Sequence, residues 1–155
     1  MKDSETVFPP ITVTDVKIER TDIHEAKLIC PATGLKPQNF TFRTGVRLSI
    51  FPKDDRIVFG FTNHVYDTNN IQHLFTIVLC VVYHVEELNK HIDFENNQLD
   101  GNLVEMLTQM TLHEADRALA PILSNTPLQE VKLEKMTDRI LLPECREKFE
   151  VIVNL

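Results

Sequence analysis

The chain has 155 residues, of which 43% are hydrophobic and 25% charged, a composition typical of one globular domain with a substantial core. Its formal net charge of −7 disfavours nucleic acid as the main partner, because phosphate binding requires clustered lysine and arginine. Three widely separated cysteines, no apolar leader and no apolar run of bilayer length predict free thiols in a cytoplasmic protein that is not inserted into a membrane.

Residues 1–10 are polar and end in a Pro-Pro pair, which predicts a flexible lead followed by a single domain over residues 11–155. The first strand opens this domain, and its apolar pattern changes phase near Asp15, which predicts a bulge or a bend. The strand can extend to Cys30. Residues 31–37 contain Pro and Gly and predict a loop that permits a crossover.

Three further strands are predicted over residues 40–51, 56–67 and 74–85, since each segment is rich in β-branched and aromatic residues. Polar turns at 52–55 and 67–70 separate them. Because turns this short join antiparallel neighbours, the four strands form an antiparallel sheet.

The strand at 74–85 is apolar on both of its faces, so that both are expected to be covered. One face carries Phe75, Ile77, Leu79, Val81 and Tyr83, and the other carries Leu74, Val78, Cys80 and Val82. The rest of the chain offers few elements to cover them. An uncovered apolar surface predicts a partner, either another subunit or a client protein.

Helical spacing of apolar residues predicts one long helix over residues 101–123, after a polar connection at 86–98. A short extended piece at 131–133 and a final helix that begins near Thr137 and is interrupted at Pro143 follow. The tail at 149–153 alternates, and helix and strand both stay open there. A sheet followed by helices defines the α+β class.

No residue pattern predicts catalysis, a cofactor or a metal. The sequence contains no nucleophile elbow and no phosphate-binding glycine loop. His64 and His73 flank a hairpin turn, but zinc needs three or four ligands in close geometry. Asp54 and Asp55 are expected to stabilise a turn. The sequence therefore predicts a protein that is not an enzyme.

Phenylalanine is the most frequent aromatic residue of this chain, and six of its rings lie on or beside the predicted sheet: Phe40, Phe42, Phe51, Phe59, Phe61 and Phe75. Core packing explains such rings in general. Their second interpretation is an apolar groove for extended peptides, in which an edge strand adds backbone hydrogen bonds.

The order of elements and three local segments resemble the SecB export chaperones over about residues 11–145. The segments are Ala115–Ser124, Thr126 to Met136, and the Asp pair at 54–55, whereas Asp116-Arg117 inverts the family's charged pair. The resemblance implies a homotetramer, built as a dimer of dimers, that holds non-native polypeptides without ATP. The resemblance also implies the export motor SecA as a candidate partner.

Three hypotheses follow. In the first, a SecB-like holdase binds precursor polypeptides, or one dedicated client such as an antitoxin, through Leu35, Phe40, Phe42, Phe51 and Leu128. In the second, the same apolar rings line a cavity between helix and sheet that binds a small hydrophobic ligand. In the third, an enzyme of unassigned class uses histidine or cysteine.

Overall fold

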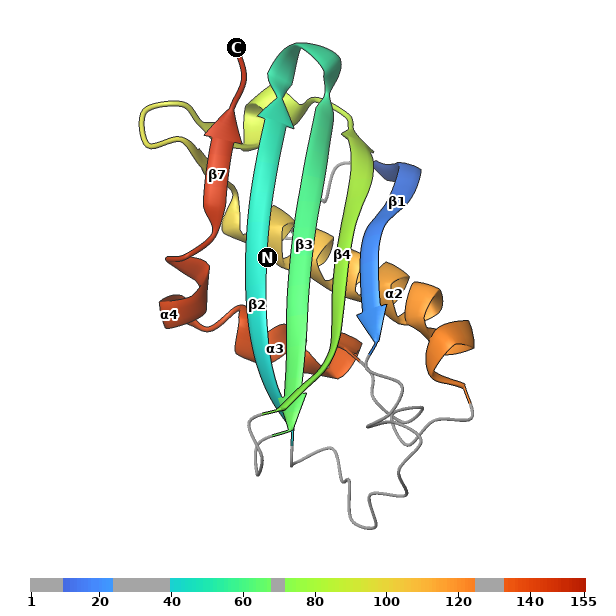
Figure 1. Ribbon diagram of the computed structural model, residues 1–155. Helices are drawn as coiled ribbons and strands as arrows, with labels where there is room; N and C mark the ends of the chain where they lie inside the picture. The colour runs from blue at the N-terminus through green and yellow to red at the C-terminus, as the bar shows by residue number, and fades with distance from the viewer. Residues whose placement is uncertain (1–9, 24–39, 68–71, 125–132) are drawn as a thin grey trace, which may run out of the picture.

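A five-stranded sheet carries its helices on one face (Figure 1). The computed structural model describes residues 10–23, 40–67, 72–124 and 133–155, so the N-terminal lead and the predicted 31–37 loop lie outside the described residues. The sheet has the order β1-β4-β3-β2-β7. Its strands are β1 (Ile11–Ile23), β2 (Phe40–Phe51), β3 (Arg56–Asp67), β4 (Gln72–Val85) and β7 (Glu150–Val153).

The predicted antiparallel hairpins are confirmed. β2 pairs with β3 without a break from Phe40 opposite Asp67 to Phe51 opposite Arg56. The turn between them is the 3-10 helix η2 (Pro52–Asp54), closed by Asp55 in a left-handed conformation with φ of 50°. β4 pairs with β3 on one side and with β1 on the other.

The predicted bend in the first strand is also confirmed. The register of β1 against β4 shifts between Val13 and Asp15, and it shifts again between Ile18 and Arg20. Each shift adds local twist to this edge of the sheet. Any continuation of β1 towards Cys30 lies outside the described residues.

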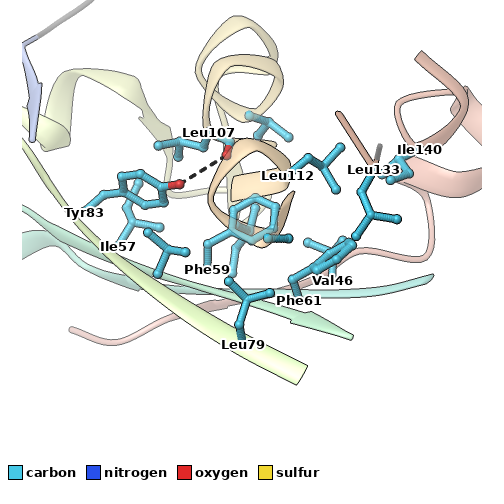
Figure 2. Close-up of a cluster of buried hydrophobic side chains, with 14 of the residues drawn as sticks. Val46, Ile57, Phe59, Phe61, Leu79, Tyr83, Leu107, Leu112, Leu133 and Ile140 are labelled. Carbon is cyan, nitrogen blue, oxygen red and sulfur yellow. Dashed lines mark hydrogen bonds between the residues drawn. The ribbon is translucent and has the colours of Figure 1, made fainter. Parts of the chain in front are cut away.

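The core lies between the sheet and helix α2 (Gly101–Leu123), whose bounds match the predicted helix. Asp100 caps the helix, its carboxylate accepting from the Asn102 amide at 3.1 Å. Alternate residues of β2, β3 and β4 on the face that carries the helix are fully buried, and Figure 2 shows Ile57, Phe59, Leu79 and Tyr83 of this set beside Leu107 and Leu112 of α2. The fully buried set includes Leu48, Ile50, Ile57, Phe59, Phe75, Ile77, Leu79, Val81 and Tyr83.

Several elements differ from the prediction. The sheet has five strands instead of four, because the ambiguous tail forms β7, parallel to β2. The connection after β4 contains the 3-10 helix η3 (Leu88–His91) and a small hairpin of β5 (Ile92–Asp93) and β6 (Gln98–Leu99). A 3-10 helix, η4 (Leu133–Met136), begins at the last residue of the predicted extended piece. The final helix begins at Thr137 and is interrupted at Pro143 as predicted, which gives two short helices, α3 (Thr137–Ile140) and α4 (Pro143–Arg146). No helix among those described is long and apolar enough to cross a membrane.

The second face of β4 is not covered by a helix in the described chain. Its residues Val78, Cys80 and Val82 are half-buried, whereas the residues between them are fully buried against α2. Since α2 and α3 lie on one side of the sheet (Figure 1), the described part of the chain supplies no helix for this second face, and its coverage by a partner stays a prediction.

Asp116 joins α2 to the C-terminal elements. Its carboxylate accepts from the amides of Leu133 at 2.6 Å and Glu134 at 2.9 Å, which caps η4. The Asp116→Asn variant should lower the free energy of unfolding by about 1–2 kcal/mol, because the charged acceptor is lost from two amides. Urea unfolding measures this. Glu105→Gln, an exposed change on the same helix, should cost under about 0.5 kcal/mol, and equal losses for the two variants would contradict the capping role.

The Tyr83 hydroxyl is buried where β4 meets α2, beside Leu107 (Figure 2). It lies 2.7 Å from the Thr111 hydroxyl. Burial raises the pKa of Tyr83 above its ordinary value of 10.0. Above about pH 10 the unfolded chain loses this proton more readily than the folded chain, so the free energy of unfolding falls as pH rises.

The Tyr83→Phe variant should lose the part of this alkaline decline that Tyr83 causes. That part amounts to about 1.4 kcal/mol of unfolding free energy per pH unit between the tyrosine pKa of the unfolded chain and that of the folded chain. Urea unfolding at about pH 8 and about pH 11 tests this. Tyr66→Phe is the matched control and should keep the Tyr83 contribution. An unchanged alkaline decline in Tyr83→Phe would refute this account.

Candidate functional site

The edge of β2 is only partly paired. β7 is four residues long and pairs with Arg47–Ile50, whereas β2 runs for twelve residues. Among the described residues, no strand pairs with the outer edge of β2 over residues 40–46. Figure 1 shows β7 beside one half of β2 and the other half continuing without a neighbouring strand on that side.

The backbone of Thr44 points towards this unpaired edge. The Asn154 amide donates to the Ile50 carbonyl at 2.8 Å, which places the backbone groups of Ile50 on the β7 side. Alternate residues of a strand direct both backbone groups to the same edge. The register of β2 is unbroken, so Thr44 also presents its N–H and C=O outward, whereas Gly45 pairs inward with Thr62 of β3.

A groove of about 610 Å³ adjoins this segment. One wall is β2 and β3, and the other is α3, α4 and the chain that leads into β7. Apolar side chains of both walls contribute to its lining, namely Val46, Ile140, Leu142 and Phe149, and Cys145 adds a half-buried free thiol. A groove beside an unpaired strand edge is the geometry that β-strand addition requires.

Gly45 lies in the middle of β2 and lines the groove. Glycine weakens a strand interior, and its presence there marks a bulge or a close approach of another backbone. The register shows no bulge at this position. A Cβ at Gly45 would meet only the Thr62 Cβ, at 3.9 Å, so contacts within the described chain do not require glycine here.

A hydrogen bond to the neighbouring strand β3 holds the Thr44 side chain in place. Its hydroxyl donates to the Asn63 side-chain oxygen at 2.9 Å, and Asn63 is only 1% exposed. The Asn63 amide nitrogen has no hydrogen-bond partner among the described residues. A buried polar group without a partner is costly.

The structure separates the residues predicted to bind peptide. Phe40 and Phe42 belong to the free-edge segment of β2, although their side chains are not among those described. Phe51 lies at the opposite end of β2, half-buried under the Arg56 guanidinium at 4.5 Å from the ring centroid. The structure therefore does not bring Phe51 to the same groove.

The remaining residues considered for peptide binding are either outside the described residues or buried in the core. Leu35 and Leu128 lie outside the described residues. Phe59, Phe61 and Phe75 are buried core, as the packing interpretation predicted. Sequence reasoning missed Thr44, Gly45 and the wall from α3 to β7, although the small residues at 44–45 inside a strand were a visible sign.

The other candidate sites have structural explanations. His64 and His73 both contact the Thr76 hydroxyl, and their ring centroids lie 6.1 Å apart. The described residues contain no group of three or more potential metal ligands. The Asp55 carboxylate accepts from the Leu88 amide at 3.3 Å, which joins the β2–β3 turn to η3, whereas the turn itself is closed by the Asp55 amide, which donates to the Pro52 carbonyl at 3.4 Å.

Comparison with solved structures finds a partial and distant match. No family model matches the sequence, and no curated protein matches it. A solved structure of a SecB-like chaperone from Mycobacterium tuberculosis, in complex with a ChAD peptide from an antitoxin, aligns with a TM-score of 0.37 and 12% identity. The alignment covers 49% of this chain and 53% of the chaperone, about half of each. This chaperone is a distant structural neighbour, and the likeness does not assign the chain to its family.

Proposed function

We propose that this protein is a chaperone that holds extended, non-native polypeptide segments without ATP. The observation that supports the proposal most is the unpaired edge of β2 over residues 40–46, beside a groove with apolar lining. A client segment would add as a strand next to β2, with its backbone bonded to Thr44.

Strand addition suits sequence-tolerant binding, because every polypeptide offers the same backbone donors and acceptors. Side chains of the client that point into the groove gain apolar contact with Val46, Ile140 and Phe149. Neither interaction needs a reactive side chain, and we therefore treat the protein as a binder instead of an enzyme. Export precursors, SecA and a cytoplasmic location belong to the same proposal as expectations from the SecB resemblance.

We place self-association at the opposite edge of the sheet. Val16 and Ile18 of β1 are 36% and 46% exposed, although their register partners Val81 and Leu79 are fully buried. β1 has no strand on its outer side among the described residues. An exposed edge strand with apolar side chains favours pairing with another copy, which is compatible with the proposed dimer of dimers.

Thr44→Pro should weaken client binding by about tenfold, because proline removes an outward N–H and obstructs an added strand. Binding of a permanently unfolded, fluorescently labelled client, followed by anisotropy, gives the dissociation constant. Suppression of client aggregation, followed by light scattering, should fall in parallel.

Thr44→Val is the matched control, since it removes the hydroxyl bond to Asn63 but keeps the backbone N–H. It should bind the client within about twofold of the unchanged protein. Urea unfolding checks that Thr44→Pro keeps the β2–β3 ladder, which the outward N–H does not join. A stable Thr44→Pro variant with full client affinity would reject binding at this edge.

The Ile18→Glu variant should reduce the molar mass in solution, since it places a charge in the proposed contact between copies. Light scattering on the unchanged protein should report a multiple of 17.9 kDa. Lys53→Glu, a change in the turn after β2, should keep the mass of the unchanged protein. A 17.9 kDa particle before any substitution would eliminate the self-association proposal.

A further inference from the structure

We propose that the β2 groove selects extended segments in which acidic residues alternate with apolar ones. This inference rests on the proposed function, because it names the client chemistry of the same groove. Three cationic side chains line the groove from different elements: Arg43 on β2, Arg139 on α3 and Lys148 before β7. Glu144 is the one carboxylate among the lining residues.

The three cations are not neutralised within the part of the chain that the structure describes. Arg43, Arg139 and Lys148 are exposed and form no ion pair with a described residue. Arg43 lies over the Tyr66 ring, 5.8 Å from its centroid, which fixes its direction without cancelling its charge. Arg47, four residues further along β2, differs because it pairs with Glu150 at 3.2 Å.

The charge of the groove opposes that of the whole chain. The protein carries a net charge of −7, whereas the groove combines three cations with one carboxylate. An acidic client would be repelled by most of this protein and attracted here, which steers its association and selects its position. A basic client would be attracted by most of this protein and repelled by the groove.

The geometry of an added strand predicts how apolar and acidic residues alternate in the client segment. Side chains of an added strand alternate between two faces. When one set points to Val46, Ile140 and Phe149, the other set points to the opposite face of β2, on which strand alternation places Arg43. A segment with period two, apolar at one set of positions and Asp or Glu at the other, satisfies both sets of contacts.

Two labelled peptides of the same length test the inference on the unchanged protein. Both carry the same apolar residues, alternating with Glu in one and with Lys in the other. Anisotropy titrations at about 20 mM salt should give about tenfold tighter binding for the Glu peptide. At about 500 mM salt the difference should shrink to about twofold, because salt screens exposed charges.

Arg139→Glu combined with Lys148→Glu should reverse the preference, so that the Lys peptide binds more tightly. Lys53→Glu combined with Lys90→Glu, two exposed changes outside the groove, should keep it. If the double reversal does not fold, Lys148→Gln alone should still reduce the preference for the Glu peptide by about threefold.

The outcomes separate this inference from the proposed function. Equal binding of the two peptides would overturn acidic selection and leave strand addition standing. Binding of neither peptide would overturn both. Binding of a single-stranded oligonucleotide as tight as that of the Glu peptide would also overturn the inference, since the groove would then select anions in general.

Discussion

The requirement that strand-edge backbone groups find hydrogen-bond partners governs this structure. β2 is twelve residues long, and β7 pairs with four of them, so one part of the edge is satisfied within the chain and residues 40–46 stay unpaired beside the groove. Proteins protect such edges by shortening, charging or covering them. Here exposed cations and the short helices α3 and α4 line the groove beside the unpaired segment of β2.

The core makes this open edge a rigid platform. Leu48 and Ile50 of β2 are fully buried against the helical layer, and β3 holds β2 in unbroken register along its length. The carboxylate of Asp116 ties η4 to α2, and α3 follows η4 directly along the chain. A platform ordered before its partner arrives loses little conformational entropy on binding, which favours affinity without large new contacts.

The sequence predicts much of this fold because its signals are local. Period-two alternation and short turns define the strands at 40–51 and 56–67, and the helix at 101–123 follows from the helical spacing of its apolar residues. The pairing of Arg47 with Glu150 joins residues far apart in the chain, and no local pattern reports it. The groove depends on that pairing, so its position at Thr44 and Gly45 could not be predicted, and Phe51 was assigned to a groove that it does not reach.

The exchange of individual backbone amides tests the account most directly. Hydrogen–deuterium exchange measured by NMR, with and without a permanently unfolded client, compares Thr44, whose N–H points outward, with Gly45, whose N–H is already paired with β3. The account predicts that the client slows exchange at Thr44 by at least about tenfold and leaves Gly45 unchanged. Saturation with client while Thr44 exchanges at its original rate would contradict the account.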